Sequence, residues 1–518
     1  MIFTFAQMAG VHWGQGEMTG TSQGHIGRVP VAPRYLGLGL FWACHMLTVR
    51  SATLMHGSTA SISAATVCTF ASFLSTMTML LAISSKIEND GAALAHLPWQ
   101  PFIISSIAGL GGIMAAGLIP DPRTAILLVA CGGILAGVGF GYLWGSWANC
   151  FGRMRPSRVA LTVPVSFFIA AALYLALSIA ADNGFLVAGA IAAALPLLSM
   201  LCLLRCRKAD GCNEPFDTDP VRTHRALGSL ASLIVASMIM SCLMGFIWEI
   251  TMLERQSVTE AHQLPLFANL IVAGALTVFV AVSRRSIDLE LAFKAVIPVV
   301  AVVLFAVPVL GESNPLALNT AMTACFWTIN MVIWYSVAAA AYDYNVPGFV
   351  LGGVVFALVL VTRMLGIGLG YLFSLIPNRP ALLFAGISAG TLYLLAMAVF
   401  FHRTRRAHAA ADRPDEQPAS DPAAKDPAAA LPDEARDARQ ADDARDAHED
   451  AICAFARDFN LTRREAEVLP YLAKGRSAKV IAEALFVSEP TIRTHTRNIL
   501  EKADLHSKQE LISLIERY

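Results

Sequence analysis

Apolar stretches of about twenty residues, the length of a helix that crosses a bilayer, recur throughout residues 35–401. There are about twelve of them, and they begin near Tyr35, Ala60, Pro101, Thr124, Val159, Gly184, Leu227, Pro265, Leu291, Ala317, Pro347 and Ala381. Because lipid offers the backbone no hydrogen-bond partners, such stretches fold as helices. The pattern predicts an all-α chain in which residues 35–401 form a polytopic membrane bundle, preceded by a tail at residues 1–34.

Basic residues favour one side of this predicted membrane domain. If the chain starts in the cytoplasm, the cytoplasmic loops hold the basic positions near residues 28–34, 86, 153–158, 205–225, 284–285 and 403–406. The opposite loops keep only Arg50, Arg123, Arg255 and Arg379. The positive-inside rule therefore places both termini in the cytoplasm.

The longest cytoplasmic loop, residues 205–226, divides the spans into two sets of roughly six. This layout resembles the major facilitator superfamily, whose two six-helix halves flank a central cavity. The family's glycine-aspartate-arginine signature should lie between the second and third spans, where this chain has SSKIENDGAALAHLP instead. The resemblance therefore implies the fold and a cavity, and it does not imply transport.

Polar side chains within the spans are candidates for binding a small-molecule ligand, since a charge within hydrocarbon is costly. Arg363 lies deep in its span, where it could bind an anionic ligand or serve packing through an ion pair or backbone carbonyls. Glu249 could pair with Arg363 or meet lipid headgroups. Trp327 and Asn330, together with Trp334, form a stripe that could line a pocket or simply pack between helices.

Residues 402–450 change to alanine, aspartate, proline and arginine. Low apolar content and net negative charge predict a disordered linker. A flexible coil of this length spans roughly 35 to 40 Å root mean square. A domain that follows it could therefore work away from the bilayer while remaining tethered.

Residues 451–518 carry the sequence signals of a small helical bundle. Thr462 and Glu465 form a capping box that predicts a helix start, Gly475 predicts its end, and Pro470 should bend it. Ser477 predicts the cap of a second helix, with these residues turned inward: Val480, Ile481, Ala484 and Leu485.

A third helix is predicted after Ser488, with Pro490 in its first turn. Its inward face should hold Ile492, Thr496, Ile499 and Ala503, and its outward face Arg493, Thr494 and Arg497. Two helices joined by a tight turn, with arginine and hydroxyl groups on the second, fit the major groove of double-stranded DNA. On spacing alone, these arginines could equally be the solvated face of a surface helix.

The segments LTRREAEVL, AKGRSAKVIAEAL and VSEPTIRTHTRNILEKADLHSKQELI resemble, without a gap, the four-helix LuxR-type helix-turn-helix domain of bacterial transcription regulators. The resemblance implies base contacts by Arg493, Thr494 and Arg497. It implies phosphate contacts by Lys479, Thr491 and His495. The family's fourth helix commonly dimerises, which here implies a homodimer through Ser507 to Tyr518. The departures are Pro470 and the alanines at 478 and 503.

These features predict a DNA-binding transcription regulator anchored in the bacterial cytoplasmic membrane, whose bundle senses a ligand or membrane signal. The alternative is a secondary transporter with a regulatory C-terminal appendage, and a weaker one is a tail that binds a protein partner. No metal-ligand spacing, no phosphate-binding glycine loop and no nucleophile with a base is found, so we expect neither an enzyme nor a cofactor.

Overall fold

The structure, a computed structural model, describes residues 32–49, 54–55, 62–210, 219–255, 258–282 and 314–376, isolated positions from 386 to 393, and most of 451–515. These residues form two separate units, which divide between residues 398 and 399. Residues 1–31 of the predicted tail, the linker at 402–450, the span near Leu291 and most of the span near Ala381 lie outside the described residues.

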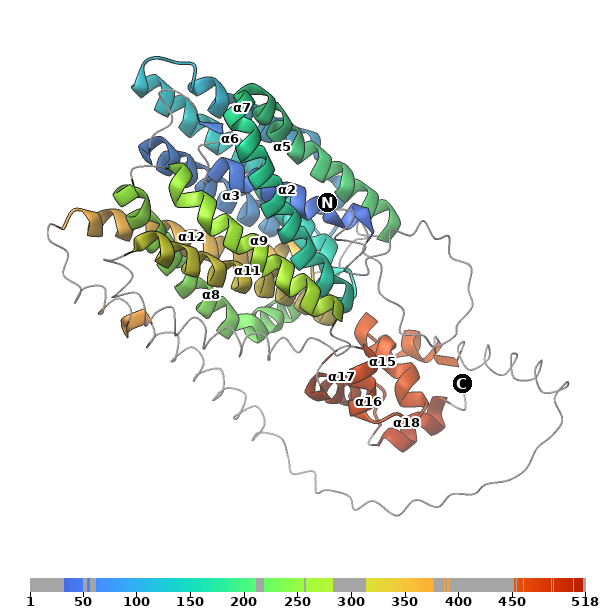
Figure 1. Cartoon of the computed structure of the whole chain (residues 1–518). Coiled ribbons are helices and arrows are strands. Elements are labelled where there is room, and N and C mark those ends of the chain that lie inside the picture. Colours follow the sequence, from blue (N-terminus) through green and yellow to red (C-terminus); the bar gives the residue numbers. More distant parts are fainter. Residues whose placement is uncertain are drawn as a thin grey trace. The chain divides into compact units, whose positions relative to one another are not determined.

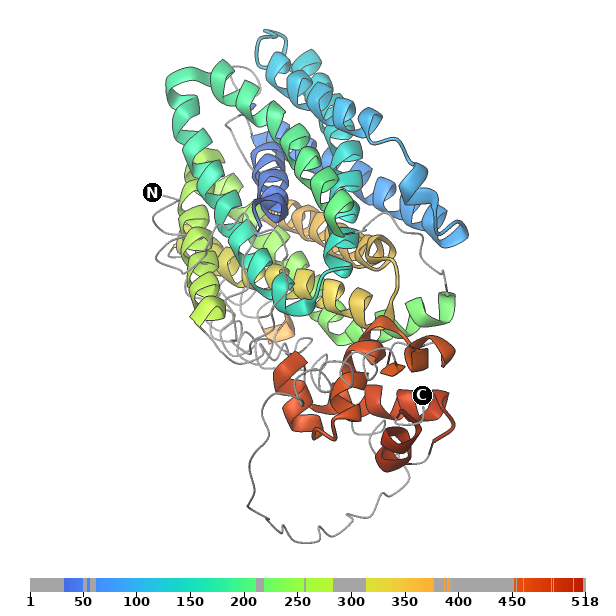
Figure 2. The same cartoon turned by 90° about the vertical axis from the view of Figure 1, so that its right-hand side faces the viewer.

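The first unit is a bundle of helices that run alongside one another (Figures 1 and 2). In chain order the described elements are η1 (Pro33–Leu36), α2 (Gly37–Val49), α3 (Ile62–Asn89), α4 (Ala93–His96), α5 (Gln100–Ala116), α6 (Pro122–Gly152), α7 (Pro156–Asp210), α8 (Pro220–Arg255), α9 (Val258–Val282), α11 (Pro315–Tyr344) and α12 (Gly348–Ser374). Helix α7 contains two spans, because its backbone leaves helical geometry at Gly184. The prediction of separate spans on either side of Gly184 is thereby confirmed.

Eight helical segments among the described residues are long and apolar enough to cross a membrane. Helices α2 and α5 are shorter, at 13 and 17 residues. Helix α2 is buried along nearly its whole length. Its all-round apolar surface is therefore explained by a central position in the bundle rather than by contact with lipid.

Helices α8 and α12 approach each other closely at two glycines. A Cβ atom added to Gly366 would lie 1.9 Å from the carbonyl oxygen of Cys242, and one added to Gly245 would lie 2.4 Å from that of Arg363. Any larger side chain would push the two backbones apart. Glycines at these positions let the two helices pack with their backbones close together.

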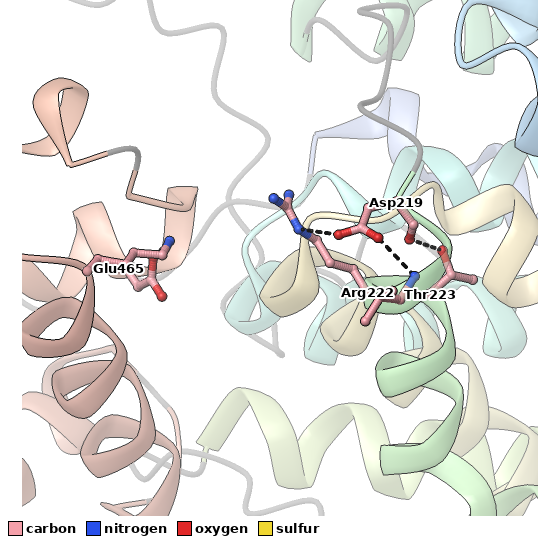
Figure 3. Close-up of polar contacts among 6 residues, drawn as sticks. Asp219, Arg222, Thr223 and Glu465 are labelled. Atoms are coloured by element: carbon pink, nitrogen blue, oxygen red, sulfur yellow. Dashed lines mark hydrogen bonds and ion pairs between the residues drawn. The ribbon is translucent and has the colours of Figure 1, made fainter.

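Helix α8 begins with a polar cap in the region predicted as the central loop. The Asp219 side chain accepts a hydrogen bond from the Val221 amide at 2.9 Å and pairs with the Arg222 Nε at 3.2 Å, while its carbonyl accepts from Thr223 (Figure 3). Because an anion near a helix N-terminus satisfies free amides, this aspartate fixes where α8 starts. Helices α7 and α8 thus extend beyond their apolar parts into residues 205–226.

The second unit contains α15 (Arg463–Ala473), α16 (Ala478–Leu485), α17 (Glu489–Lys502) and α18 (Lys508–Ile515). They follow a short helical turn that supplies Ile452 and Phe455 to a separate apolar core. Ile481, Ile492, Ile499 and Leu511 are fully buried in that core. This unit therefore carries the apolar contacts of an independently folding domain.

Candidate nucleic-acid interface and membrane-domain site

The predicted capping box is present at the start of α15. The Thr462 hydroxyl accepts from the Glu465 amide at 3.4 Å, and the Glu465 carboxylate accepts from the Thr462 amide at 2.8 Å. The helix ends near Gly475, whose φ of +69° lies in the left-handed region that glycine adopts without strain. Pro470 lies within α15, where it leaves one backbone carbonyl without its usual donor.

Helix α16 presents a different inward face from the one predicted. Ile481 and Ala482 are buried, whereas Val480 is 43% exposed and Ala484 is exposed as well. The prediction for Val480 and Ala484 is wrong, because a helix of eight residues has room for only a narrow contact stripe, and here it is centred on Ile481. The side chain of Lys479 lies outside the described residues.

Helix α17 separates an apolar face from a cationic one, as predicted. Ile492 and Ile499 are fully buried in the core, while Arg493, Thr494 and Arg497 are exposed. Thr491, in the first turn, is half-buried. The exposed face combines two guanidinium groups, which can donate to guanine edges in the major groove, with a threonine, whose hydroxyl can bond a base and whose methyl group can contact a thymine methyl.

His495 lies on the other side of α17, with only 8% of its surface exposed. Burial, together with the positive charge of Arg464, lowers the pKa of the imidazole to about 4. His495 is therefore neutral at pH 7 and faces the protein core rather than solvent. Arg464 is itself buried, and it pairs with Glu467 at 2.7 Å and donates to the Leu485 carbonyl.

In the membrane unit, the described residues Arg363 and Glu249 are both buried, and no ion pair joins them. Their exposed fractions are 4% and 1%. The Arg363 guanidinium lies 4.7 Å from the ring centre of Phe326 on α11, a cation–π distance. Its Nη1 and Nη2 find no acceptor among the described residues, and neither does Glu249 Oε2 find a donor.

Trp327 and Asn330 are buried within α11, at 4% and 7% exposure. Trp327 packs edge-on against Trp42 of α2, with ring centres 5.2 Å apart. Trp42 in turn lies 4.9 Å from Trp144 of α6 and 6.4 Å from Trp334 of α11. These four residues, Trp42, Trp144, Trp327 and Trp334, are called the tryptophan cluster below. Sequence reasoning found only its α11 members, because nothing local in α2 or α6 indicates which helices will meet.

The second unit is similar in sequence to known bacterial regulators. Residues 460–515 match the family described as bacterial regulatory proteins, luxR family. These residues form a LuxR-family helix-turn-helix domain. The oxygen regulatory protein NreC of Staphylococcus haemolyticus is 52% identical over 52 residues, which are 10% of this chain and 24% of NreC. The response regulatory protein YgeK of Escherichia coli is 45% identical over 58 residues, which are 11% of this chain and 40% of YgeK.

The likeness to these regulators is confined to the LuxR-family domain, so this chain spans about a quarter of the length of NreC. The remaining part resembles a transporter in fold. The crystal structure of the human organic anion transporter MFSD10 superposes with a TM-score of 0.50, covering 70% of this chain and 97% of MFSD10, at 13% identity. The chain therefore joins a bundle of apolar helices, whose fold is like that of MFSD10, to a LuxR-family domain, as the sequence predicts.

Proposed function

We propose that this chain is a membrane-anchored transcription regulator, in which the bundle senses a small-molecule ligand or membrane signal and controls the tethered LuxR-family domain at double-stranded DNA. The observation that carries the proposal is the exposed face of Arg493, Thr494 and Arg497 on α17, in a chain that also holds a bundle of the major facilitator type. The protein then resides in the bacterial cytoplasmic membrane with both termini in the cytoplasm.

In the proposed complex, α17 enters the major groove. Arg493 and Arg497 pair with guanine edges, and Thr494 contacts a base or a thymine methyl group. Lys479 and Thr491 contact phosphates at the flank of the groove. His495 is left out of this interface, because a neutral imidazole in the core brings no charge to a phosphate.

Dimerisation through Ser507–Tyr518 completes the proposal. Of this segment the structure describes α18, which places Leu511 and Ile515 in the core of its own domain and leaves Gln509 and Glu510 exposed. Two copies of the domain would contact two half-sites of an operator. If the membrane domain changes how often two tethered copies meet and dimerise, it thereby changes the occupancy of the operator.

Binding of the segment from residue 450 onward to a promoter fragment tests the DNA interface. The fragment is found first by mapping the DNA that the intact protein holds in cells. Arg493→Ala and Arg497→Ala should each weaken binding about tenfold or more, because each removes a bidentate base contact. Arg457→Ala removes the same charge outside the helix-turn-helix and should change binding little. Equal affinity for all four proteins would refute the assigned interface.

A tail that binds a protein partner is separated from a DNA-binding tail by salt. Replacement of several phosphate counterions gives a steep fall of log affinity with log salt concentration. A shallow dependence would favour the protein partner.

The transporter alternative has one observation in its favour, the likeness of the bundle to a transporter over 70% of the chain. It requires ligand flux through the protein in vesicles, with loss of flux in Arg363→Met. Ligand-dependent transcription in the absence of any flux would discard the transporter and retain the sensor.

A further inference from the structure

Every member of the tryptophan cluster holds a hydrogen-bond donor that finds no acceptor in the described part of the chain. The indole N–H groups of Trp42, Trp144, Trp327 and Trp334 have no partner among the described residues, and each residue is at most 4% exposed. A buried tryptophan normally finds an acceptor for its N–H, since an unmade bond costs free energy. Four unmade bonds in one contiguous cluster are therefore a feature to explain.

The cluster lies where the two halves of the bundle meet. Trp42 and Trp144 come from α2 and α6, before the central loop, and Trp327 and Trp334 come from α11, after it. The ring centre of Phe167 of α7 lies 5.2 Å from that of Trp42 and 5.2 Å from that of Trp327. The ring centre of Phe356 of α12 lies 4.7 Å from that of Trp334. The interface of two structural repeats is where membrane transport proteins place their substrate sites.

Arg363 extends this chain of rings with a cation. Its guanidinium lies 4.7 Å from the Phe326 ring, and the Phe326 ring centre is 6.2 Å from that of Trp327. Both terminal nitrogens of Arg363 lack an acceptor among the described residues. These two nitrogens and the four indole N–H groups are all hydrogen-bond donors, and aromatic rings surround them.

We infer that the tryptophan cluster and Arg363 form a binding site for a planar aromatic carboxylate. A carboxylate has acceptors and no donor, so it complements the guanidinium in bidentate fashion and accepts from indole N–H groups. A planar aromatic body matches the faces and edges of the surrounding rings. An amine would add donors and a positive charge beside Arg363, and is excluded by the same argument.

This inference deepens the proposed function, because it names the class of signal that the membrane domain would sense. Binding is nevertheless measured without DNA. The full chain is placed in lipid nanodiscs and equilibrated with 2-naphthoate, 2-naphthamide or 2-naphthylmethylamine, and empty nanodiscs supply the background. We expect saturable binding of 2-naphthoate at least tenfold tighter than that of the amine, with the amide in between.

Variants separate the charge from the donors. Arg363→Met should abolish the preference for 2-naphthoate over 2-naphthamide while leaving the amide bound. Trp327→Phe keeps a ring and removes one N–H, and should weaken both ligands several-fold. Without ligand, the same variant should melt at or above the wild-type temperature, because it removes an unsatisfied donor.

Trp147→Phe is the matched control. Trp147 is fully buried, but its N–H donates to the Ser199 hydroxyl at 3.0 Å and it lies outside the cluster. Its replacement should lower the melting temperature and leave binding unchanged. If Trp147→Phe weakened binding as much as Trp327→Phe does, the proposed site would be overturned.

Two further outcomes are decisive. Binding of 2-naphthoate no tighter than that of 2-naphthylmethylamine, or no binding above empty nanodiscs, overturns the inference even if the membrane domain is shown to control transcription. Conversely, specific binding of 2-naphthoate supports the site even if operator occupancy proves independent of the membrane domain, an outcome that would remove the proposed function alone.

Discussion

Lys502, in the last turn of α17, donates to the carboxylate of Glu465 in the first turn of α15, with Nζ and Oε2 2.6 Å apart. The same carboxylate oxygen accepts from the Thr462 amide and so belongs to the capping box. One oxygen thereby joins the start of the first helix to the end of the proposed DNA-contacting helix. Despite the cost of burial, the bonds from Lys502 and Thr462 keep the pKa of Glu465 below its usual range.

Lys502→Met should lower the stability of the LuxR-family domain. Glu465 is buried and would lose one of its compensating partners, whereas Lys502 is partly exposed and its charge is partly screened. We expect a decrease in the free energy of unfolding of about 1 kcal/mol, measured by urea denaturation of the segment from residue 450 onward. Lys474→Met removes an exposed lysine and serves as the control, with a change within about 0.5 kcal/mol.

The buried His495 should make the domain less stable in mild acid. Its pKa falls from 6.5 to about 4 on folding, so between these values the unfolded state binds more protons than the folded state. Above pH 6.5 the imidazole is neutral in both states and the domain keeps its full stability. As the pH falls from 6.5 toward 4, protonation of His495 in the unfolded state lowers the free energy of unfolding. The loss at pH 5 should be about 2 kcal/mol relative to pH 7.5.

The measurement is urea unfolding of the same segment at a series of pH values from 5 to 7.5. His495→Gln cannot gain this proton, so its stability should change much less over that range, whatever its value at neutral pH. An equally steep loss in the variant would show that other groups cause the acid sensitivity.

Local signals in the helix-turn-helix were sufficient where neighbouring residues alone decide the structure. The capping box of Thr462 and Glu465 depends on residues within one turn, and the two faces of α17 follow from its periodicity. The same periodicity places His495 on the buried face, three residues after Ile492 and four before Ile499, and the phosphate contact implied by the family resemblance did not take this into account. The register of α16 was misjudged because tertiary contacts choose which stripe of a short helix is buried.

Span length and charge were sufficient to predict the membrane bundle, because hydrocarbon restricts the backbone to helices. They could not predict which spans are neighbours. Trp42 and Trp327 are far apart in sequence, and their contact at 5.2 Å depends on the packing of two halves of the chain. Arg363 was identified as a costly buried charge from sequence alone, whereas its position over Phe326 required the structure.

The contact between α8 and α12 should tolerate no side chain at Gly366. A Cβ there would lie 1.9 Å from the Cys242 carbonyl oxygen, whereas one at Gly368, half a turn away, would meet nothing within 4 Å. Gly366→Ala should destabilise the bundle by about 1–3 kcal/mol through overpacking. Gly368→Ala should be neutral or slightly stabilising, because alanine favours the helix. Thermal denaturation of the purified full chain in detergent compares the two, and equal melting temperatures would contradict the packing described.

The LuxR-family domain should be protected from protease outside intact spheroplasts. The positive-inside rule predicts that the C-terminal segment lies in the cytoplasm, because arginine clusters adjoin the predicted cytoplasmic ends of the spans. Trypsin is the suitable probe, since residues 402–450 contain several arginines and cleavage among them would release the compact domain. We expect release only after the spheroplasts are lysed, detected with an antibody against the domain. Its appearance before lysis would place the domain on the side without DNA, and a regulator could not work from there.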